Sequence, residues 1–502
     1  MEVKVQDLMT SSGVKFGTSG ARGLADDMTD FVCYVYTRGF LQHLESVGEI
    51  NKGGTEVAIA GDLRPSTDRI MEAVRRAAAE MGYTPINCGK VPSPAAALYG
   101  IVNRVPAIMV TGSHIPADRN GIKFNKAAGE ILKSDEAGIR EQVVSLDESL
   151  FTDAKSFASP LDEQWPLSDA AGKMYVDRYL DVFPGDCLKG RRIGVYQHSA
   201  VGRDIILEIA KGLGAEAVAL GRSDTFIPVD TEAIRAEDVE LAAKWATEDS
   251  YDAIISTDGD SDRPLIADEK GRWLRGDVAG ILCAKYLAAD SVSTPVSCNT
   301  AVEKSGYFRN VSRTRIGSPY VIASMIEAVE SGAKVAVGYE ANGGFLTNSD
   351  IRLFGKTLRA LPTRDAAILH LSIMLLAATE GKKLSELVAD LPERYTASDR
   401  LKNFPQEDSK SILSMFDSGD EEKDRARAAD VFGGLCGNCR GIDRTDGVRM
   451  TFDNDEVIHL RPSGNAPEFR CYTEAAAEDR AVELNSACMK ILTALKQNAG
   501  RK

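Results

Sequence analysis

A short acidic stretch near the middle of the chain limits what this protein can be, and it reads Thr257-Asp258-Gly259-Asp260-Ser261-Asp262-Arg263-Pro264. Three carboxylates at alternate positions repel one another unless something positive lies among them. The apolar segments 251–256 and 265–267 predict short strands on either side, which places the carboxylates on a tight loop. Oxygen ligands of this kind suit a hard divalent cation such as Mg²⁺. The adjacent Arg263 indicates that an anion, phosphate above all, accompanies the cation.

Two other interpretations of this stretch are weighed against the first. Four acidic residues match positions 1, 3, 5 and 12 of an EF-hand calcium loop, namely Asp258, Asp260, Asp262 and Glu269. That loop requires glycine at position 6, where this chain has Arg263, and it requires flanking helices where strands are predicted here. We therefore reject a calcium loop. A solvated acidic turn is the alternative that this stretch alone leaves open.

Length and charge narrow the class of protein. A chain of 502 residues is too long for one hydrophobic core and predicts about three or four domains. Its 43% hydrophobic and 27% charged content is that of an ordinary globular protein. A formal net charge of −14, without any run of lysine or arginine, argues against nucleic acid as a partner.

The sequence gives little indication of a membrane segment or of disulfide bonds. Residues 1–16 lack an apolar core of signal-peptide length, and the apolar helix predicted at 368–378 is too short to span a bilayer. Nine scattered cysteines fit reduced thiols, and the pair Cys436 and Cys439 lacks the further ligands of a zinc site. We therefore expect a cytoplasmic enzyme with no membrane partner.

The order of predicted elements gives the fold class. Strands and helices alternate up to the helix predicted at 363–378, which indicates parallel or mixed sheets with functional loops at the carboxyl ends of strands. The tail instead shows short strands followed by one helix. We predict an α/β fold of three consecutive mixed-sheet α/β domains plus a smaller C-terminal α+β domain around a central cleft. The expected domains are 1–160, 161–272, 273–395 and 396–502.

Two local expectations concern the first domain boundary. The polar segment 156–169, rich in Ser, Asp and Pro, is predicted to be a connector. The helix predicted at 68–81 has an amphipathic pattern that indicates a solvent-facing side for Arg75, Arg76 and Glu80.

Three further loops follow predicted strands. They read Thr111-Gly112-Ser113-His114, Glu340-Ala341-Asn342-Gly343-Gly344 and Arg461-Pro462-Ser463-Gly464-Asn465-Ala466-Pro467. Together with the acidic loop, and in this order, they resemble the loops of the α-D-phosphohexomutase family, which includes phosphoglucomutase, phosphomannomutase and phosphoglucosamine mutase. The resemblance covers nearly the whole chain, and the order of four loops is far more specific than any one motif.

The resemblance implies that the first domain carries the reacting serine. Ser113 would bear a phosphoryl group, with His114 beside it and Lys123 as a candidate general acid or base. Arg22, in the segment 16–23, would reach the reacting phosphate. Taken singly, these residues would be a turn serine, a solvated lysine and a surface arginine.

The resemblance also implies the metal site and the substrate contacts. Mg²⁺ would be held by a phosphate oxygen on Ser113 and by the three aspartates Asp258, Asp260 and Asp262, with Arg263 beside them. In the third domain, Glu340 and Asn342 would contact sugar hydroxyls. In the last domain, the phosphate group that is not being transferred would bind four residues, namely Arg461, Ser463, Gly464 and Asn465.

The sequence departs from the family pattern at several loop positions. Ser261 stands where glycine is commoner, Asn342 replaces a serine, and Gly344 replaces a histidine that sometimes transfers a proton. Asn465 and Ala466 replace a threonine-bearing pair, which removes one hydroxyl donor.

The activity implied by the resemblance is phosphohexomutase chemistry. Ser113 would pass its phosphoryl group to a hexose monophosphate, giving a hexose 1,6-bisphosphate, a trace of which serves as primer. Mannose 6-phosphate and mannose 1-phosphate are the preferred pair, followed by glucose phosphates and then glucosamine phosphate. The alternatives are a sugar-phosphate- or Ca²⁺-binding protein without catalysis, and a phosphatase.

Overall fold

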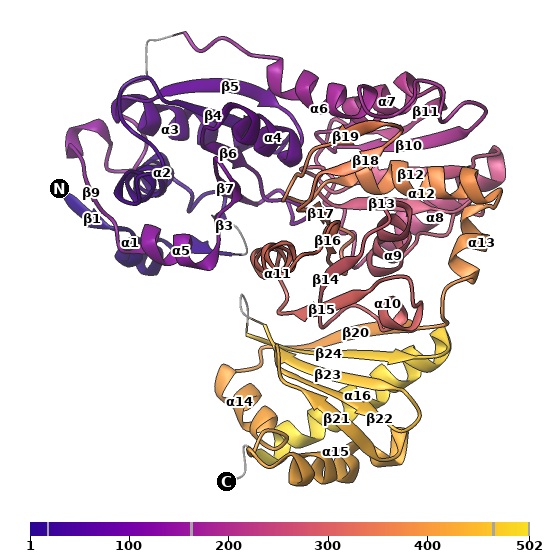
Figure 1. Cartoon of the computed structure of the whole chain (residues 1–502). Coiled ribbons are helices and arrows are strands. Elements are labelled where there is room, and N and C mark those ends of the chain that lie inside the picture. Colours follow the sequence, from indigo (N-terminus) through magenta and orange to yellow (C-terminus); the bar gives the residue numbers. More distant parts are fainter. Residues whose placement is uncertain (18–19, 161–163, 464–466, 500–502) are drawn as a thin grey trace. The chain divides into compact units, whose positions relative to one another are not determined.

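The computed structural model describes residues 1–17, 20–160, 164–463 and 467–499, and it divides into two compact units (Figure 1). The first unit is Met1–Val292 with Gly317–Leu387, and the second is Ser293–Ile316 with Val388–Lys502. The chain passes from the first unit to the second within β14 (Ser291–Pro295), returns before α11 (Ser318–Glu330), and leaves again within α13 (Leu384–Ala389).

The first sheet of unit one is mixed, with strand order β2-β3-β7-β6-β4-β5 and β8 beside β7. β4 pairs in parallel with β5 and β6, whereas β7 is antiparallel to β6 and β3. Its strands are β2 (Lys15–Phe16), β3 (Gly20–Leu24), β4 (Glu56–Gly61), β5 (Thr84–Lys90), β6 (Ala107–Val110), β7 (Arg119–Lys126) and β8 (Gly129–Glu130). β1 (Glu2–Lys4) and β9 (Val143–Ser145) form a separate antiparallel pair.

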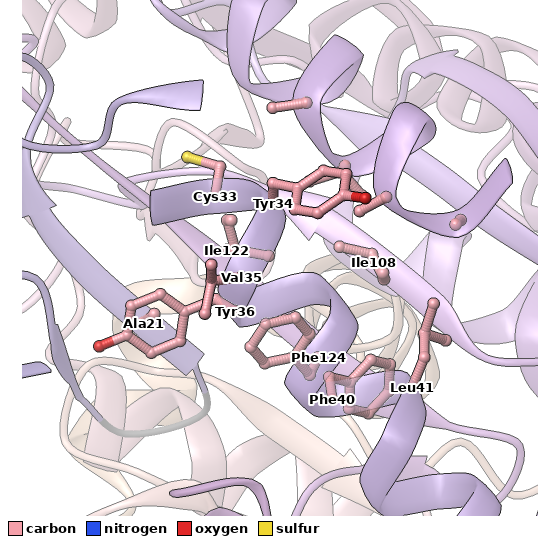
Figure 2. Close-up of a cluster of buried hydrophobic side chains, with 14 of the residues drawn as sticks. Ala21, Cys33, Tyr34, Val35, Tyr36, Phe40, Leu41, Ile108, Ile122 and Phe124 are labelled. Atoms are coloured by element: carbon pink, nitrogen blue, oxygen red, sulfur yellow. The ribbon is translucent and has the colours of Figure 1, made fainter. Parts of the chain in front are cut away.

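Alternation along the strands divides the side chains of this sheet between its two faces. Ile108 of β6 and Phe124 of β7 join the aromatic core of α2, where Phe40 stacks on Phe124 with ring centroids 4.6 Å apart (Figure 2). Each such buried aromatic contributes about 2 kcal/mol. The helices around this sheet are α1 (Val5–Ser12), α2 (Asp30–Ser46), α3 (Thr67–Glu80), α4 (Ser93–Asn103) and α5 (Lys133–Arg140).

The prediction that Arg75 and Arg76 of α3 face solvent is wrong. Arg75 and Arg76 are each only 6% exposed. Their guanidinium groups lie over the rings of Trp165 and Phe157, which belong to the segment predicted as a polar connector. That segment therefore covers α3, because its aromatic side chains bury the arginine stems and leave the charges partnered.

The second sheet has the order β11-β10-β12-β13 and is also mixed, since only the β12–β13 pair is antiparallel. Its strands are β10 (Arg192–His198), β11 (Glu216–Arg222), β12 (Ala253–Thr257) and β13 (Pro264–Ala267), and its helices are α6 (Ala170–Leu180), α7 (Arg203–Gly212) and α8 (Ala236–Glu248). The tight β12–β13 hairpin holds the acidic loop at its tip.

The remaining part of unit one supplies the loop 340–344, which the resemblance predicts to contact sugar hydroxyls and which is called the sugar loop for that reason. β16 (Ala336–Tyr339) and β17 (Phe345–Thr347) pair antiparallel around residues 340–344. β18 (Ile351–Leu353) and β19 (Lys356–Leu358) form a hairpin that sequence analysis did not anticipate. The apolar helix α12 (Ala366–Glu380) packs on α9 (Gly276–Tyr286).

Unit two contains an antiparallel sheet of order β20-β24-β23-β22-β21. Its strands are β20 (Tyr395–Lys402), β21 (Cys439–Asp443), β22 (Val448–Phe452), β23 (Val457–Pro462) and β24 (Glu468–Ala475). Its helices are α14 (Gln406–Ser414), α15 (Glu421–Cys436) and α16 (Glu478–Ala499), and the unit also includes α10 (Ala301–Lys304) and β15 (Asn310–Thr314).

Cysteine and membrane expectations are tested by the same structure. All nine cysteines are free thiols. In the part of the chain that the structure describes, no helix is long and apolar enough to cross a membrane.

Candidate functional site

Ser113 lies in the loop that follows β6. Its backbone has a left-handed φ of 57°, which is uncommon for a residue with a side chain and clusters at functional turns. The Ser113 N–H donates to Thr111 Oγ1 at 2.8 Å, and the Ser113 hydroxyl donates to Asp258 Oδ2 at 2.6 Å. The structure therefore brings this serine into contact with an aspartate 145 positions further along the chain.

The acidic loop approaches Ser113 closely because Gly259 has no side chain. A Cβ at Gly259 would lie 2.6 Å from the Ser113 carbonyl oxygen. Strands β12 and β13 flank the loop, as the sequence predicted, and exclude an EF-hand.

Ser261, which stands where glycine is commoner in the family, takes a left-handed φ of 59°. This conformation costs about 1 kcal/mol for a residue with a Cβ. The Ser261 hydroxyl accepts hydrogen bonds from the Gly202 N–H at 2.9 Å and from Thr257 Oγ1 at 2.8 Å. These two bonds offset the strain and fix the loop to the start of α7.

The three carboxylates of the acidic loop are buried, and one oxygen of each lies within 4.8 Å of the others. Lys123 Nζ donates to Asp260 Oδ2 and Asp262 Oδ2, both at 2.6 Å, and Ser93 Oγ donates to Asp260 Oδ2 at 2.5 Å. Among the described residues, Asp260 Oδ1 and Asp262 Oδ1 have no hydrogen-bond partner. Buried anionic oxygens without partners are costly, and a hard divalent cation would satisfy them. The residues present therefore fit a divalent metal.

Burial sets the charge states around this trio. Burial, and then repulsion from Asp260 and Asp262, raises the pKa of Asp258 well above its ordinary value. Burial works against charge on Lys123, but the attraction of Asp260 and Asp262 outweighs it and raises the pKa of Lys123. Lys123 is therefore an ammonium group that pairs with two of the three carboxylates.

Two arginines, Arg263 and Arg22, lie close enough to His114 to act on its charge. Arg263 Nη1 donates to His114 Nδ1 at 2.8 Å. Burial, followed by the charge of Arg263, lowers the pKa of His114 to about 3, so the imidazole is neutral at neutral pH. Burial, followed by Arg263, lowers the pKa of Arg22 to about 10.

Two of these arginines have unused donors. Arg263 Nε is buried without a hydrogen-bond partner, although it lies 3.9 Å from Asp258 Oδ2 and 3.8 Å from Asp262 Oδ1. No described residue forms a hydrogen bond or ion pair with the guanidinium of Arg22. Guanidinium donors left open beside a serine hydroxyl suit the oxygens of a phosphoryl group.

Arg64 and Asp62 hold the serine loop, and sequence reasoning did not single them out. Arg64 donates through Nη2 to the carbonyls of Ser113 and Ile115 at 2.7 and 2.6 Å, and through Nε to Asp62 Oδ2 at 3.0 Å. Asp62 Oδ2 also accepts from Thr111 Oγ1 at 2.7 Å. The available signal was the position of Asp62 and Arg64 immediately after the strand β4, at the carboxyl end where functional loops gather.

The sugar loop is a tight turn closed by its own backbone. The Glu340 N–H donates to Gly344 O at 3.1 Å, and the Gly343 N–H donates to Glu340 O at 2.9 Å. Asn342 Oδ1 accepts from the Gly344 N–H at 2.9 Å, and the Asn342 carbonyl accepts from Thr231 Oγ1 at 2.7 Å. The second sheet's domain therefore helps to hold the loop in place.

Arg364 joins the sugar loop to the acidic loop and is the second residue that sequence reasoning missed. Its Nε donates to Glu340 Oε1 at 2.7 Å, and its Nη1 donates to Asp262 Oδ2 at 3.0 Å. Burial opposes the charge of Arg364, but Glu340 and Asp262 outweigh it and raise its pKa well above the ordinary value. The sequence predicted a helix at 363–378 that would have included Arg364. In the structure α12 begins at Ala366 and leaves Arg364 in the preceding loop.

The remaining predicted residues belong to unit two. Arg461, near the end of β23, forms an ion pair through Nε with Asp446 Oδ2 at 2.9 Å. The Ser463 N–H donates to Glu468 O at 2.8 Å. Gly464 and Asn465, which were predicted to bind phosphate, lie outside the described residues.

Comparison with known proteins defines the class. Models of phosphoglucomutase/phosphomannomutase α/β/α domains I, II and III match residues 13–149, 173–271 and 275–395. The chain belongs to the phosphoglucomutase/phosphomannomutase family, which confirms the predicted α-D-phosphohexomutase resemblance and its fold of three α/β domains followed by a sheet domain. The protein is therefore an enzyme of the mutase class.

Two relatives and one solved structure show which members of the family the chain resembles. The chain is 45% identical over 495 residues to a phosphomannomutase of Salmonella muenchen, covering 99% of this chain and 98% of the relative. It is 41% identical over 480 residues to a phosphomannomutase of Sinorhizobium fredii, covering 96% and 99%. Among solved structures, a putative phosphomannomutase from Thermus thermophilus has the same fold, with a TM-score of 0.72 at 19% identity over 96% of this chain and 99% of that one.

Proposed function

We propose that this protein interconverts mannose 6-phosphate and mannose 1-phosphate through a phosphoserine at Ser113 and a hexose 1,6-bisphosphate. The observation that carries the proposal is the 2.6 Å hydrogen bond from Ser113 Oγ to Asp258, inside a trio of buried carboxylates. The choice of mannose rests on the two relatives that are 45% and 41% identical over nearly the full chain.

Mg²⁺ is the proposed metal because the donor set consists only of oxygens. Asp258, Asp260, Asp262 and an oxygen on Ser113 would hold it. When bound, the ion supplies positive charge that stabilises the phosphoryl oxygens and the serine oxygen as leaving group.

The side chains around Ser113 divide the work of phosphoryl transfer. In the forward step the bond from phosphorus to Ser113 Oγ breaks and a bond forms to a hydroxyl oxygen of the hexose monophosphate, whose proton passes to Lys123 and replaces the one that Lys123 gives to the serine oxygen. The open donors of Arg22 and Arg263 bind the phosphoryl oxygens as charge develops. Lys123, held as an ammonium group, serves as proton donor to the serine oxygen, and the neutral His114 accepts from Arg263 and orients it.

Substrate contacts come from the other loops. Glu340 and Asn342 bind sugar hydroxyls, and the non-reacting phosphate binds Arg461, Ser463, Gly464 and Asn465. On this proposal the domain at 1–160 carries the phosphoserine, 161–272 the metal, 273–395 the sugar loop and 396–502 the phosphate loop. A trace of hexose 1,6-bisphosphate primes the serine, and the reaction takes place in the cytoplasm without nucleic acid or membrane.

Coupled assays with the 1-phosphates of mannose, glucose and glucosamine, each with Mg²⁺ and bisphosphate primer, test the proposal. We expect the highest kcat/KM for mannose 1-phosphate, then glucose 1-phosphate. Ser113→Ala should abolish isomerisation while hexose phosphate still binds, and Ser149→Ala, at an exposed serine away from the site, should behave as the wild type. Equal rates on all three sugars would contradict the mannose preference.

The same assays separate the other classes of function. A phosphatase would release inorganic phosphate and would need no bisphosphate primer. A binding protein without catalysis would bind hexose phosphate and turn over none of the three sugars.

A further inference from the structure

Arg364 is buried and bonded to side chains from several different parts of unit one. Besides Glu340 and Asp262, the guanidinium donates through Nη2 to Ser318 Oγ at 2.9 Å. Its Nη1 also lies 3.9 Å from Glu130 Oε1 of β8. The Arg364 side chain is only 3% exposed, so these contacts are shielded from bulk solvent. One residue thus links the first sheet, the acidic loop and the sugar loop.

Gly344 makes room for this arginine. A Cβ at Gly344 would lie 2.4 Å from Arg364 Cδ and 2.9 Å from Arg364 Cγ. No positive φ requires glycine at this position, so the constraint is space rather than backbone conformation. The stem of Arg364 therefore occupies the volume that any side chain at position 344 would need.

The backbone around Arg364 is fixed by its neighbours. Asp365 accepts from the hydroxyl of Tyr175 at 2.6 Å and from the hydroxyl of Tyr179, and its N–H donates to Phe345 O at 2.8 Å. Thr363 Oγ1 donates to Glu130 Oε1 at 2.8 Å. Residues on both sides of Arg364 are therefore tied to other elements, which limits how far its guanidinium can move.

The bonds of Arg364 leave particular oxygens free. Arg364 and Lys123 both bind Asp262 through Oδ2, and Asp262 Oδ1 has no hydrogen-bond partner among the described residues. Arg364 binds Glu340 through Oε1. The arginine therefore sets the orientation of one carboxylate at the metal trio and one in the sugar loop.

We propose that Arg364 is a positioning residue that couples sugar binding at Glu340 to metal binding at Asp262, and that Gly344 is required to admit it. This inference rests on the proposed mutase function. It predicts that disturbing Arg364 weakens hexose phosphate binding and metal binding together, because one guanidinium orients both carboxylates. A residue that only supported the fold would alter the melting temperature and leave the two affinities unchanged.

The test compares Arg364→Gln, Arg364→Lys and Gly344→Ala with Arg359→Gln, a control at an exposed arginine paired with Asp350. Arg364→Gln is expected to raise both the KM for mannose 1-phosphate and the half-saturating Mg²⁺ concentration about tenfold. Arg364→Lys should recover only part of this loss, because the lysine ammonium keeps the positive charge but cannot bond three partners at once as the guanidinium does. Arg359→Gln should match the wild type.

Gly344→Ala gives the sharper result because it keeps every charge. Displacing the arginine stem should reproduce both increases, and the double variant Gly344→Ala/Arg364→Gln should be no worse than Arg364→Gln alone. Effects that multiply in the double variant, or a Gly344→Ala variant that behaves as the wild type, would overturn the inference. If Arg364→Gln does not fold, Gly344→Ala and Arg364→Lys decide the question in the same way.

Calorimetric titration with Mg²⁺ and with mannose 1-phosphate separates this inference from the proposed function. If the wild type converts no hexose phosphate but Gly344→Ala lowers both binding affinities, the mutase proposal fails and the role of Arg364 stands. If the wild type is active and the variants change neither affinity, the mutase proposal stands and the role of Arg364 is wrong.

Discussion

The acidic loop and the sugar loop are both tight hairpin turns that present carboxylates, yet they obtain their charge balance differently. The acidic loop carries three carboxylates and Arg263 within a single stretch of sequence, although the cations hydrogen-bonded to it, Lys123 and Arg364, come from elsewhere in the chain. The sugar loop has one carboxylate, Glu340, whose cationic partner Arg364 lies 24 positions further along the chain. The contiguous carboxylates of the acidic loop can be recognised from sequence, whereas the distant cations that bind both loops require the fold.

Metal removal should produce the largest effect and should act on the acidic loop. Chelation with EDTA is expected to lower turnover more than about 1,000-fold, because the carboxylates of Asp260 and Asp262 then repel the phosphoryl group. Added Mg²⁺ should restore the rate, which is the control. Turnover that survives exhaustive chelation would remove the metal from the account.

Glu340→Gln should act on the sugar loop and leave the metal trio complete. It removes the charge that faces Arg364, so the KM for mannose 1-phosphate should rise about tenfold with a smaller change in kcat. Steady-state kinetics at saturating Mg²⁺ measure both. A fall in kcat with an unchanged KM would show that Glu340 serves the reacting phosphate instead of the sugar.

Two buried histidines that contact the strands beside the acidic loop should make the stability of the protein depend on pH. His198 Nε2 lies 2.8 Å from Thr257 O, and His370 Nε2 lies 3.0 Å from Leu265 O. Burial lowers the pKa of each from 6.5 to about 4. Between those values the unfolded chain binds protons that the folded chain does not, so stability falls as pH drops from about 6.5 to 4, by up to about 3 kcal/mol for each histidine.

Thermal unfolding across this pH range measures the effect. His370→Gln keeps a hydrogen-bond donor for Leu265 O but cannot titrate, so its melting temperature should fall less steeply below pH 6.5 than that of the wild type. Equal slopes for the two proteins would contradict the assignment to His370.

Ser261→Gly should have the smallest effect. Glycine relieves about 1 kcal/mol of left-handed strain but loses the bonds to Gly202 and Thr257, worth a similar amount. Activity is expected to stay within about twofold of the wild type in the coupled assay. A large loss would mean that the Ser261 hydroxyl has a role beyond holding the loop.

Local patterns predicted the elements that position the site, because apolar strands followed by polar turns are readable without tertiary information. The strands around the acidic loop, the sugar loop and the phosphate loop were anticipated within a few residues. β20, β21, α14 and α15 were missed, as their exposed faces give weak periodicity.

The features that the sequence could not predict depend on contacts between residues far apart in the chain. Arg64 reads as an ordinary turn residue until the fold places four carbonyl oxygens around its guanidinium. The burial of Arg75 under Trp165 likewise depends on a segment that returns to α3 much later in the chain. Gly344 was read as the loss of a side chain, and only the structure reveals that the stem of Arg364 fills the space.

The phosphorylation state of Ser113 tests the central claim most directly. Intact-mass and peptide mass spectrometry of the protein, after incubation with a hexose 1,6-bisphosphate and Mg²⁺, should find one added phosphoryl group on Ser113, and none on Ser113→Ala. An active protein that gains no phosphoryl group, or that carries it on another residue, would contradict the account.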